Sequence, residues 1–507
     1  MNILDRAIGV FSPGWQAARL KSRNQVQAYE AATPTKTHRG KRERRTADQL
    51  TRAGSQSLRE QARYLDDNHD LVIGVLDKLE ERVIGENGIA VDPLPRLKDG
   101  TIDKALAGQI SRLWGEWSVN PEVTGEFNRG MLERMMLRSW LRDGEVFAQC
   151  IKGRQEDLTP PAGIYFWLQA LECDFVPLDD DPGQNIIQGV RKNTHGGPKA
   201  YQVYKNHPGA TYHTKGDVNE VSAENMLHVK FSRRFHQTRG VSMLSGVIMR
   251  LAALKEYEDA ELVAARIAAS LGMYIKKGDG QSYDDTSSEE DRDIEIEPGI
   301  IFDGLQQGEE IGMIKSDRPN PNLETFRSGQ LRAIAAGVRL SYSSASRNYN
   351  GTFSAQRQEL VESTAGYAVL QQWFIQTFTR RVYRMWLRMA ISSGKIKVPA
   401  NLDKDTLYSA KYRGPSMVWI DPVKEAQAWR IRIRAGGATE AEMIRASGHN
   451  PDEVKAERLS EIEENKKHGL IFDSDPRNDK GKNDTKTSRR KAKKQPQPDN
   501  NEDKKNE

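Results

Sequence analysis

Three long helical segments dominate the hydrophobic pattern of the chain. They cover residues 244–275, 322–340 and 354–391. A polar stretch, residues 277–318, separates the first two segments, and a Ser/Asn-rich loop, residues 341–351, separates the last two. Their residue patterns do not indicate catalysis, so we interpret them as struts, a connecting loop and a contact module. A chain with this arrangement is expected to be a component of an assembly.

The first strut changes character along its length. Its first half carries an apolar stripe that includes Leu244, Leu251 and Leu254, at helical spacing. No Gly or Pro falls between Gly246 and Gly272, so a helix could run for about 38 Å at 1.5 Å per residue. The second half is rich in alanine, and small side chains allow another helix to approach closely. We expect packing either within one subunit or against neighbouring copies, through Ala260, Ala264, Ala265, Ala268 and Ala269.

The polar stretch between the first two helices predicts a small exposed β module. Two short strand-like pieces, residues 299–302 and 310–314, follow an acidic run of low hydrophobicity. The acidic positions that we single out in that run are Asp284, Asp285, Glu289, Glu290 and Asp291.

The first half of the chain predicts an α+β domain. Thr46 and Gln49 form a capping-box pattern that opens a helix running to a turn at Gly85. Two further helices precede the Asp143-Gly144 turn. Strand-like runs bounded by Pro and Gly turns then indicate a mostly antiparallel sheet with helices on it. These runs are residues 146–151, 165–171, 186–191, 199–204 and 226–231.

The third helical segment ends in a stretch that mixes arginines with aromatic residues. Gly366 is a possible kink in this helix. Interleaved arginines and aromatics are able to bind nucleic acid, but aromatics at helical spacing are more often core residues, which we favour. Capping patterns at Thr439 and Asn450 predict short helices farther on, and the charged tail from about residue 471 predicts disorder.

Composition limits the function classes. Of 507 residues, 37% are hydrophobic and 29% are charged, and the net charge is +5, which is weak for a dedicated tight binder of nucleic acid. The two cysteines, Cys150 and Cys173, lie in apolar runs and predict buried free thiols. No run approaches the roughly 18 apolar residues of a spanning helix, and the start of the chain is a poor signal peptide. We therefore expect a soluble protein made in the cytoplasm, with no membrane partner.

Sequence motifs for catalysis or metal binding are missing. The chain has no phosphate-binding Gly-x-x-x-x-Gly-Lys-Ser/Thr loop, no CxxC pair and no HExxH. Its histidines are scattered, mostly in predicted turns. We therefore predict no enzyme activity, no cofactor and no metal, although a carboxylate-rich nuclease site stays open as an alternative.

Several segments resemble one protein family, in the family's order and over most of the chain from about residue 60 to 460. They resemble the lambda-type portal proteins of tailed bacteriophages. The loop "LSYSSASRNYNGTFSAQR" departs from the family, which commonly has a Pro-containing turn there. The matching segments include "DNHDLVIGVLDKLEERVIGENGI", "VSAENMLHVKFSRRFHQTRGVSMLSGVI", "YEDAELVAARIAAS", "NYNGTFSAQRQELVE" and "IDPVKEAQA".

The resemblance implies a portal fold with long stem and tunnel helices, an α/β wing, a small β-containing clip and a helical crown. The implied regions are a basic N-terminal arm (1–55), wing (56–243), first stem helix (244–276), clip (277–319), second stem helix (320–340), tunnel loop (341–353), kinked tunnel helix (354–392), wing return and crown (393–470) and charged tail (471–507).

The resemblance also implies a function and its partners. The family forms a ring of twelve subunits at one capsid vertex, through which double-stranded DNA is packaged and ejected. Implied partners are the terminase large subunit, the major capsid or scaffold protein and head–tail adaptor proteins, in a virion assembled in the host bacterial cytoplasm. Another structural ring or scaffold protein, or a nuclease, is the alternative.

The family position assigns the loop to the DNA channel. Asn350-Gly351 is a pair that can adopt the positive-φ turn of a tight loop. Arg347 and Tyr349 are the large side chains that could reach a phosphate backbone. The predicted channel residues are Ser343, Ser344, Ser346, Arg347, Asn348, Tyr349, Asn350 and Thr352.

Overall fold

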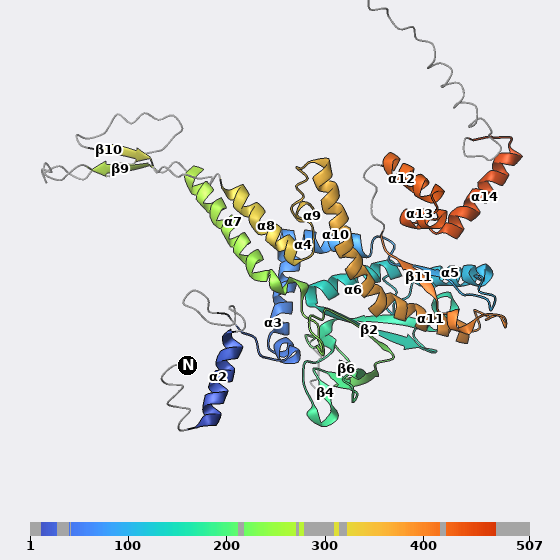
Figure 1. The fold of residues 1–507 in the computed structure, drawn as a ribbon, viewed down its shortest axis with the longest axis horizontal. Coiled ribbons are helices and arrows are strands. Elements are labelled where there is room, and N and C mark those ends of the chain that lie inside the picture. Colours follow the sequence, from blue (N-terminus) through green and yellow to red (C-terminus); the bar gives the residue numbers. More distant parts are fainter. Residues whose placement is uncertain are drawn as a thin grey trace, which may run out of the picture.

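The protein combines a helical and sheet-containing body with a projecting pair of helices (Figure 1). The computed structural model describes residues 12–27, 40, 42–210, 217–269, 273–277, 309–313, 322–415 and 422–472. The mixture of helices and antiparallel strands confirms the predicted α+β class.

The N-terminal half supplies the body helices α3 to α6 and a first helix, α2, that stands apart from them (Figure 1). Thr46 caps α3 with the predicted capping box: its hydroxyl accepts from the Gln49 amide at 3.2 Å, and Gln49 reaches back to the Thr46 amide at 2.9 Å. The prediction of one helix to Gly85 is wrong, because buried His69 is extended (φ −124°, ψ 109°) and separates α3 from α4. The helices are α2 (Pro13–Gln27), α3 (Ala47–Asn68), α4 (Asp70–Val83), α5 (Lys104–Ser118) and α6 (Arg129–Asp143).

Two antiparallel sheets follow these helices. The three-stranded sheet has the order β3-β2-β8, and the four-stranded sheet has the order β4-β5-β6-β7. Residues 186–191, predicted as one strand, form a hairpin because Gln188 (φ 50°) and Gly189 (φ 73°) turn the chain. The strands are β2 (Glu145–Lys152), β3 (Phe166–Leu171), β4 (Ile186–Ile187), β5 (Val190–Lys192), β6 (Pro198–Tyr204), β7 (Val218–Ser222) and β8 (Met226–Lys230).

Strand β2 has apolar side chains on both faces and therefore separates two hydrophobic cores. Val146, Ala148 and Cys150 belong to the larger core, shared with the helices, and Phe147 belongs to the smaller core beneath the four-stranded sheet. Alternation along the strand sends successive side chains to opposite faces. Both cysteines are buried and free, as predicted.

The aromatic residues of the third helical segment are core residues, as favoured from the sequence. Trp386 packs against Trp114 of α5 with ring centroids 4.9 Å apart, and Trp114 in turn contacts Trp117 at 4.9 Å. Tyr383 and Phe374 are also fully buried. The arginines of the same stretch lie elsewhere on the helix.

The third segment is interrupted later than expected. Helix α10 (Phe353–Phe374) continues through Gly366, and the irregularity is a π turn at Ile375–Thr379 before α11 (Arg380–Ser392). The Thr377 hydroxyl bonds back to the Trp373 carbonyl at 2.8 Å within this turn. Strand β11 (Ala410–Arg413) then pairs with β1 (Ala90–Pro93). Three helices follow: α12 (Pro422–Arg434), α13 (Glu440–Ala446) and α14 (Pro451–Lys467). As predicted, Thr439 caps α13 and Asn450 caps α14.

The projecting pair consists of α7 (Ile248–Ala269) and α8 (Leu323–Gly337), which run antiparallel (Figure 1). Arg250 bonds Gln330 at 2.8 Å near the body, and the Tyr257 and Phe326 rings lie 4.7 Å apart farther out. At the base, a Cβ on Gly337 would lie 2.4 Å from the Val247 side chain, so only glycine permits this approach.

The first strut is shorter than the sequence suggested. Residues 273–275, predicted as the end of this helix, belong instead to β9 (Met273–Lys277), which pairs with β10 (Glu309–Met313). The predicted strand at 310–314 is thus confirmed within one residue, and it pairs with β9. Residues 299–302 lie outside the described residues.

A buried ion cluster joins the body to the start of the projecting pair. Arg239 is fully buried and donates to Glu145 at 2.7 Å, and its other N–H groups reach the carbonyls of Cys173, Val176, Pro177 and Gln188, each at 3.0 Å. Glu145 also accepts from the Gly240 amide at 2.8 Å. Burial alone would raise the pKa of the Glu145 carboxyl, but Arg239, His228 and Arg59 outweigh it and hold the pKa well below its usual range.

We expect Glu145→Ala to destabilise the fold by about 3–5 kcal/mol, because it leaves the Arg239 charge buried without its partner. Chemical denaturation would measure the loss. The matched control is Glu224→Ala, which removes an exposed carboxylate and should change the unfolding free energy by less than about 0.5 kcal/mol. Equal losses in the two variants would contradict the role given to this cluster.

His228 should contribute a pH dependence to stability. Burial lowers its pKa from 6.5 to about 4, despite its hydrogen bond to Glu145. Between these two pH values the His228 side chain is protonated in the unfolded chain but neutral in the folded chain. The contribution of His228 to the free energy of unfolding is therefore complete above pH 6.5 and is lost as pH falls towards about 4. Denaturation at several pH values should show a shallower decline in His228→Gln. Identical pH profiles for the two proteins would refute it.

Candidate functional site

The predicted loop between the second and third long helices contains a helix of its own. Residues Tyr342–Ser346 form α9, a single short turn that joins α8 to α10 (Figure 1). Ser341 caps this turn, because its side chain accepts from the Ser344 amide at 3.2 Å. Propensity reasoning missed the turn because Ser and Asn are also the common residues of irregular loops.

Internal hydrogen bonds use the three predicted channel serines. The Ser343 amide donates to Glu359 of α10 at 3.0 Å, and the Ser343 hydroxyl donates to the other oxygen of the same carboxylate. The Ser346 hydroxyl donates to the Tyr342 carbonyl at 2.8 Å, and Ser344 shares the cap with Ser341. All three serines are only partly exposed. The turn is therefore fastened to α10 rather than hanging free.

The second half of the loop is the part that faces outward. Arg347, Tyr349, Asn350 and Thr352 are exposed, with Tyr349 at 55%, and Asn348 is partly buried. Arg347, not Asn350-Gly351, adopts the left-handed conformation (φ 56°), which corrects the predicted position of the turn. The Gln356 side chain donates to the Tyr349 carbonyl, and Thr352 caps α10 through the Ala355 amide at 3.3 Å.

The first helix of the projecting pair leaves apolar side chains without cover within one chain. Met249 is 81% exposed, and Leu262 and Val263 are each about half exposed. Of the predicted packing alanines, Ala260 is exposed and Ala264 and Ala265 are partly buried. The side chains of Ala268 and Ala269 lie outside the described set, although their backbone belongs to α7. Singly scattered apolar residues are ordinary, but several along one exposed helix suit a contact with another molecule.

The acidic residues predicted for the module at the tip lie outside the described residues. Asp284, Asp285, Glu289, Glu290 and Asp291 therefore remain a sequence-based prediction. The hairpin of β9 and β10 beyond the projecting pair is the described part of that module (Figure 1).

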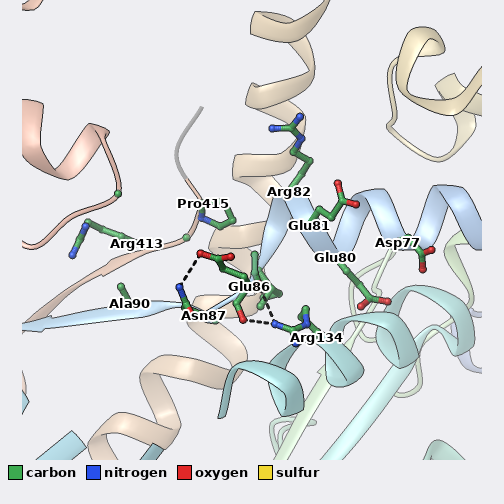
Figure 2. A pocket seen from close by; sticks show the side chains of 15 residues that line it. Asp77, Glu80, Glu81, Arg82, Glu86, Asn87, Ala90, Arg134, Arg413 and Pro415 are labelled. Carbon is green, nitrogen blue, oxygen red and sulfur yellow. Dashed lines mark hydrogen bonds between the residues drawn. The ribbon is translucent and has the colours of Figure 1, made fainter. Parts of the chain in front are cut away.

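A hollow of about 890 Å³ lies where the end of α4 and the Gly85–Gly88 turn meet α6 and β11 (Figure 2). Its lining carries both charge signs. Arg134 donates to the carbonyls of Gly85 and Glu86, while Asp77 and Glu80 bind Arg138 at 2.7 and 2.6 Å. Because the acids and bases mostly serve structural pairs, the hollow resembles a contact surface more than a reaction site.

Three potential metal ligands come together in the part of the chain that the structure describes. Ligand atoms of Glu172, Asp174 and His207 lie within 4.8 Å of one another. Asp174 is already bound by Arg59 at 3.2 Å and Arg63 at 2.5 Å. These guanidinium groups supply the positive charge that a metal would bring, so we assign no metal site here.

Comparison with known proteins identifies the family. The model of the phage portal proteins of the lambda family matches residues 33–371, well over half of the chain. The chain belongs to this family. Portal proteins are structural rather than enzymatic, in agreement with the prediction that the protein is not an enzyme.

Individual relatives agree with the family. A probable portal protein of Halomonas phage phiHAP-1 is 24% identical over 480 residues, which cover 90% of each chain. Portal protein B of Escherichia phage lambda is 24% identical over 406 residues, covering 72% of this chain and 75% of its own. A solved chain from the neck of an empty gene transfer agent particle aligns with 14% identity and a TM-score of 0.43, over 78% of this chain and 94% of its own.

In the described part of the portal chain, no helix is both long enough and apolar enough to cross a lipid bilayer. No sequence signal marked the residue that anchors the α9 turn. Glu359 lies in a helical run with nothing to set it apart from neighbouring glutamates, because its partner Ser343 is defined only once α9 folds back on α10.

Glu359→Ala should loosen α9, since it removes the acceptor of the Ser343 amide. With about 1 kcal/mol for one such hydrogen bond, we expect amide exchange at Ser343 to accelerate roughly fivefold. Hydrogen-exchange mass spectrometry measures this directly. Glu362→Ala removes an exposed carboxylate of the same helix and serves as the control. Unchanged exchange in the Glu359 variant would show that the anchor is not needed.

Proposed function

We propose that this portal protein forms a closed ring of twelve copies at one capsid vertex. Double-stranded DNA is packaged and later ejected through the channel of the ring, and the protein acts in the virion as the head–tail connector. Family membership supports this proposal at the level of the whole chain. The feature that carries it in this chain is the loop after α8, a fastened polar turn that presents Arg347 and Tyr349.

The charge of this loop suits a channel through which DNA slides. Arg347 is the single charged residue between positions 341 and 352. Each phosphate that a protein neutralises adds about 0.9 to the salt dependence of binding, and a ring repeats every contact in each subunit. A loop with many cations would hold DNA in place. One arginine, one tyrosine and small polar groups favour weak, sequence-independent contact instead.

The exposed side of α7 supports contact between neighbouring copies. In a head-to-tail ring each copy offers one surface to one neighbour and a different surface to the other. Met249, Leu262 and Val263 are apolar and uncovered, and Ala264 and Ala265 leave room for close approach. We assign residues 244–276 and 320–340 to the stem and residues 56–243 to the wing. Residues 393–470 return to the wing and then form the crown.

The module of residues 277–319 is proposed as the clip. The projecting helices carry it away from the body, so it would stand at one end of the ring (Figure 1). Its acidic residues would contact the terminase large subunit during packaging and the head–tail adaptor proteins afterwards. The wing is the candidate surface for the major capsid or scaffold protein, and assembly would take place in the host cytoplasm.

We expect Arg347→Gln combined with Tyr349→Ala to leave ring formation intact while weakening DNA retention or packaging. Both side chains are exposed, and the hydrogen bonds of α9 do not use them, so the fold should persist. A packaging assay in the complete assembly system, with rings counted by electron microscopy, separates the two effects. Arg112→Gln, an exposed arginine paired with Glu116 at 3.8 Å, is the control.

Point substitutions are preferable to shortening the loop, because removal of residues 344–348 would delete most of α9. Normal packaging and DNA retention by the double variant would contradict the assignment of the loop. Failure of the unmodified protein to form rings would contradict the proposal itself and favour another scaffold role.

A further inference from the structure

The outer face of α11 carries a line of arginines. Arg380, Arg384 and Arg388 are spaced four residues apart, so successive members of this arginine stripe rise by about 6 Å along one face of the helix. Arg384 and Arg388 are exposed and Arg380 is partly exposed. Buried aromatic residues of the same helix, including Tyr383 and Trp386, belong to the core.

Tyrosine rings hold the stripe in place. The guanidinium carbons of Arg384 and Arg388 both lie 5.5 Å from the centre of the Tyr408 ring, and that of Arg380 lies 5.3 Å from the Tyr412 ring. Such cation–π contacts fix planar side chains that would otherwise sample many rotamers. The positive groups are thus ordered before any ligand binds.

The stripe lacks the acidic partners found elsewhere on this protein. Within the described ranges, none of its three arginines forms an ion pair with a carboxylate, whereas Arg138 alone binds Asp66, Asp77 and Glu80. Like charges four residues apart on a helix repel one another. A bound polyanion would remove this repulsion.

We propose that the arginine stripe of α11 binds the phosphate backbone of double-stranded DNA, independently of sequence and at a surface separate from the loop of residues 341–353. The inference rests on the proposed function, which brings DNA to the ring. It adds a second DNA-binding surface that does not require threading through the channel.

DNA fits the stripe better than an acidic protein segment does. Guanidinium groups match phosphate oxygens in a two-point geometry that a lysine cannot supply. The stripe spans about 12 Å, and duplex DNA presents one charge per roughly 1.7 Å of axis, so a straight duplex offers phosphates along its whole length. An acidic side-chain cluster would have to match three positions individually.

Covalently closed circular DNA separates this surface from the channel, because a closed circle cannot thread through a ring. Binding of a small closed circular duplex to assembled rings would be measured across a series of salt concentrations. We expect the triple variant Arg380→Gln, Arg384→Gln and Arg388→Gln to bind about tenfold more weakly or worse at low salt. The slope of the logarithm of the binding constant against the logarithm of the salt concentration (the salt slope) should become shallower by up to about 0.9 for each phosphate that the stripe no longer neutralises. Arg→Lys at the three positions should retain much of the slope.

The matched control removes the same charge from a different helix. The control variant carries three substitutions on α14: Lys455→Gln, Arg458→Gln and Lys466→Gln. Because six acidic residues of α14 repel phosphate, its binding of circular DNA should change little. Ring formation, checked by native mass measurement, verifies that each variant assembles. Intact circular-DNA binding by the Arg347 and Tyr349 double variant would support a stripe that acts separately from the loop, whatever that variant does to packaging.

Unchanged affinity and salt slope in the stripe variant would overturn the inference. It would also be overturned if the variant kept circular DNA binding but lost binding to a polyglutamate peptide, since the stripe would then be a docking surface for an acidic protein. Equal losses in the stripe variant and the α14 control would show general charge attraction and no site.

Discussion

The buried pair of Glu145 and Arg239 is the interaction on which the rest of the structure depends. Both side chains are fully inaccessible, and the arginine binds carbonyls from the segment after β3 and from the β4–β5 hairpin. Isolated buried charges are very unfavourable, so each residue is tolerable only while the other is in place. Arg59 of α3 also lies 3.4 Å from the Glu145 carboxylate, so this cluster connects the three-stranded sheet, the four-stranded sheet and α3.

Two glycines next to this pair direct the chain into the projecting helices. A Cβ on Gly240 would lie 2.0 Å from the Gly144 carbonyl oxygen, and a Cβ on Gly144 would lie 2.2 Å from the Val241 backbone. Gly144 also has φ 92°, which side-chain-bearing residues rarely adopt. The segment before α7 can thus press directly against the start of β2. This contact lies a few residues before α7 begins at Ile248.

Local sequence signals predicted much of the fold. The capping box at Thr46, the left-handed end of α6 at Gly144 and the apolar strand-like run of β2 all depend on residues close together in the chain. Features that depend on distant partners were not predictable. Arg239 lies 94 positions from Glu145, and the strand at residues 273–277 exists because β10 pairs with it across the insert. The helical pattern continued to residue 275 and gave no sign of the change.

In the candidate site, too, features set by neighbouring residues were predictable and features set by distant partners were not. The polar composition indicated a loop between the long helices, and its place in the channel is a proposal from family position. Within the chain, Glu359 and the Ser341 cap take up polar groups of the serines, which hold the turn in place. Exposure then singles out Arg347 and Tyr349. On α11 the helical period correctly placed the aromatics in the core, yet the order of the arginines comes from Tyr408 and Tyr412, which lie beyond the helix in sequence.

The most direct test of the account is a three-dimensional reconstruction of the assembled protein by electron cryomicroscopy. The account predicts a closed ring in which α7 of each copy contacts its neighbour and residues 347–352 are the part of the chain nearest the central axis. A ring with Arg347 on its outer surface, or a protein that stays monomeric at all concentrations, would contradict it.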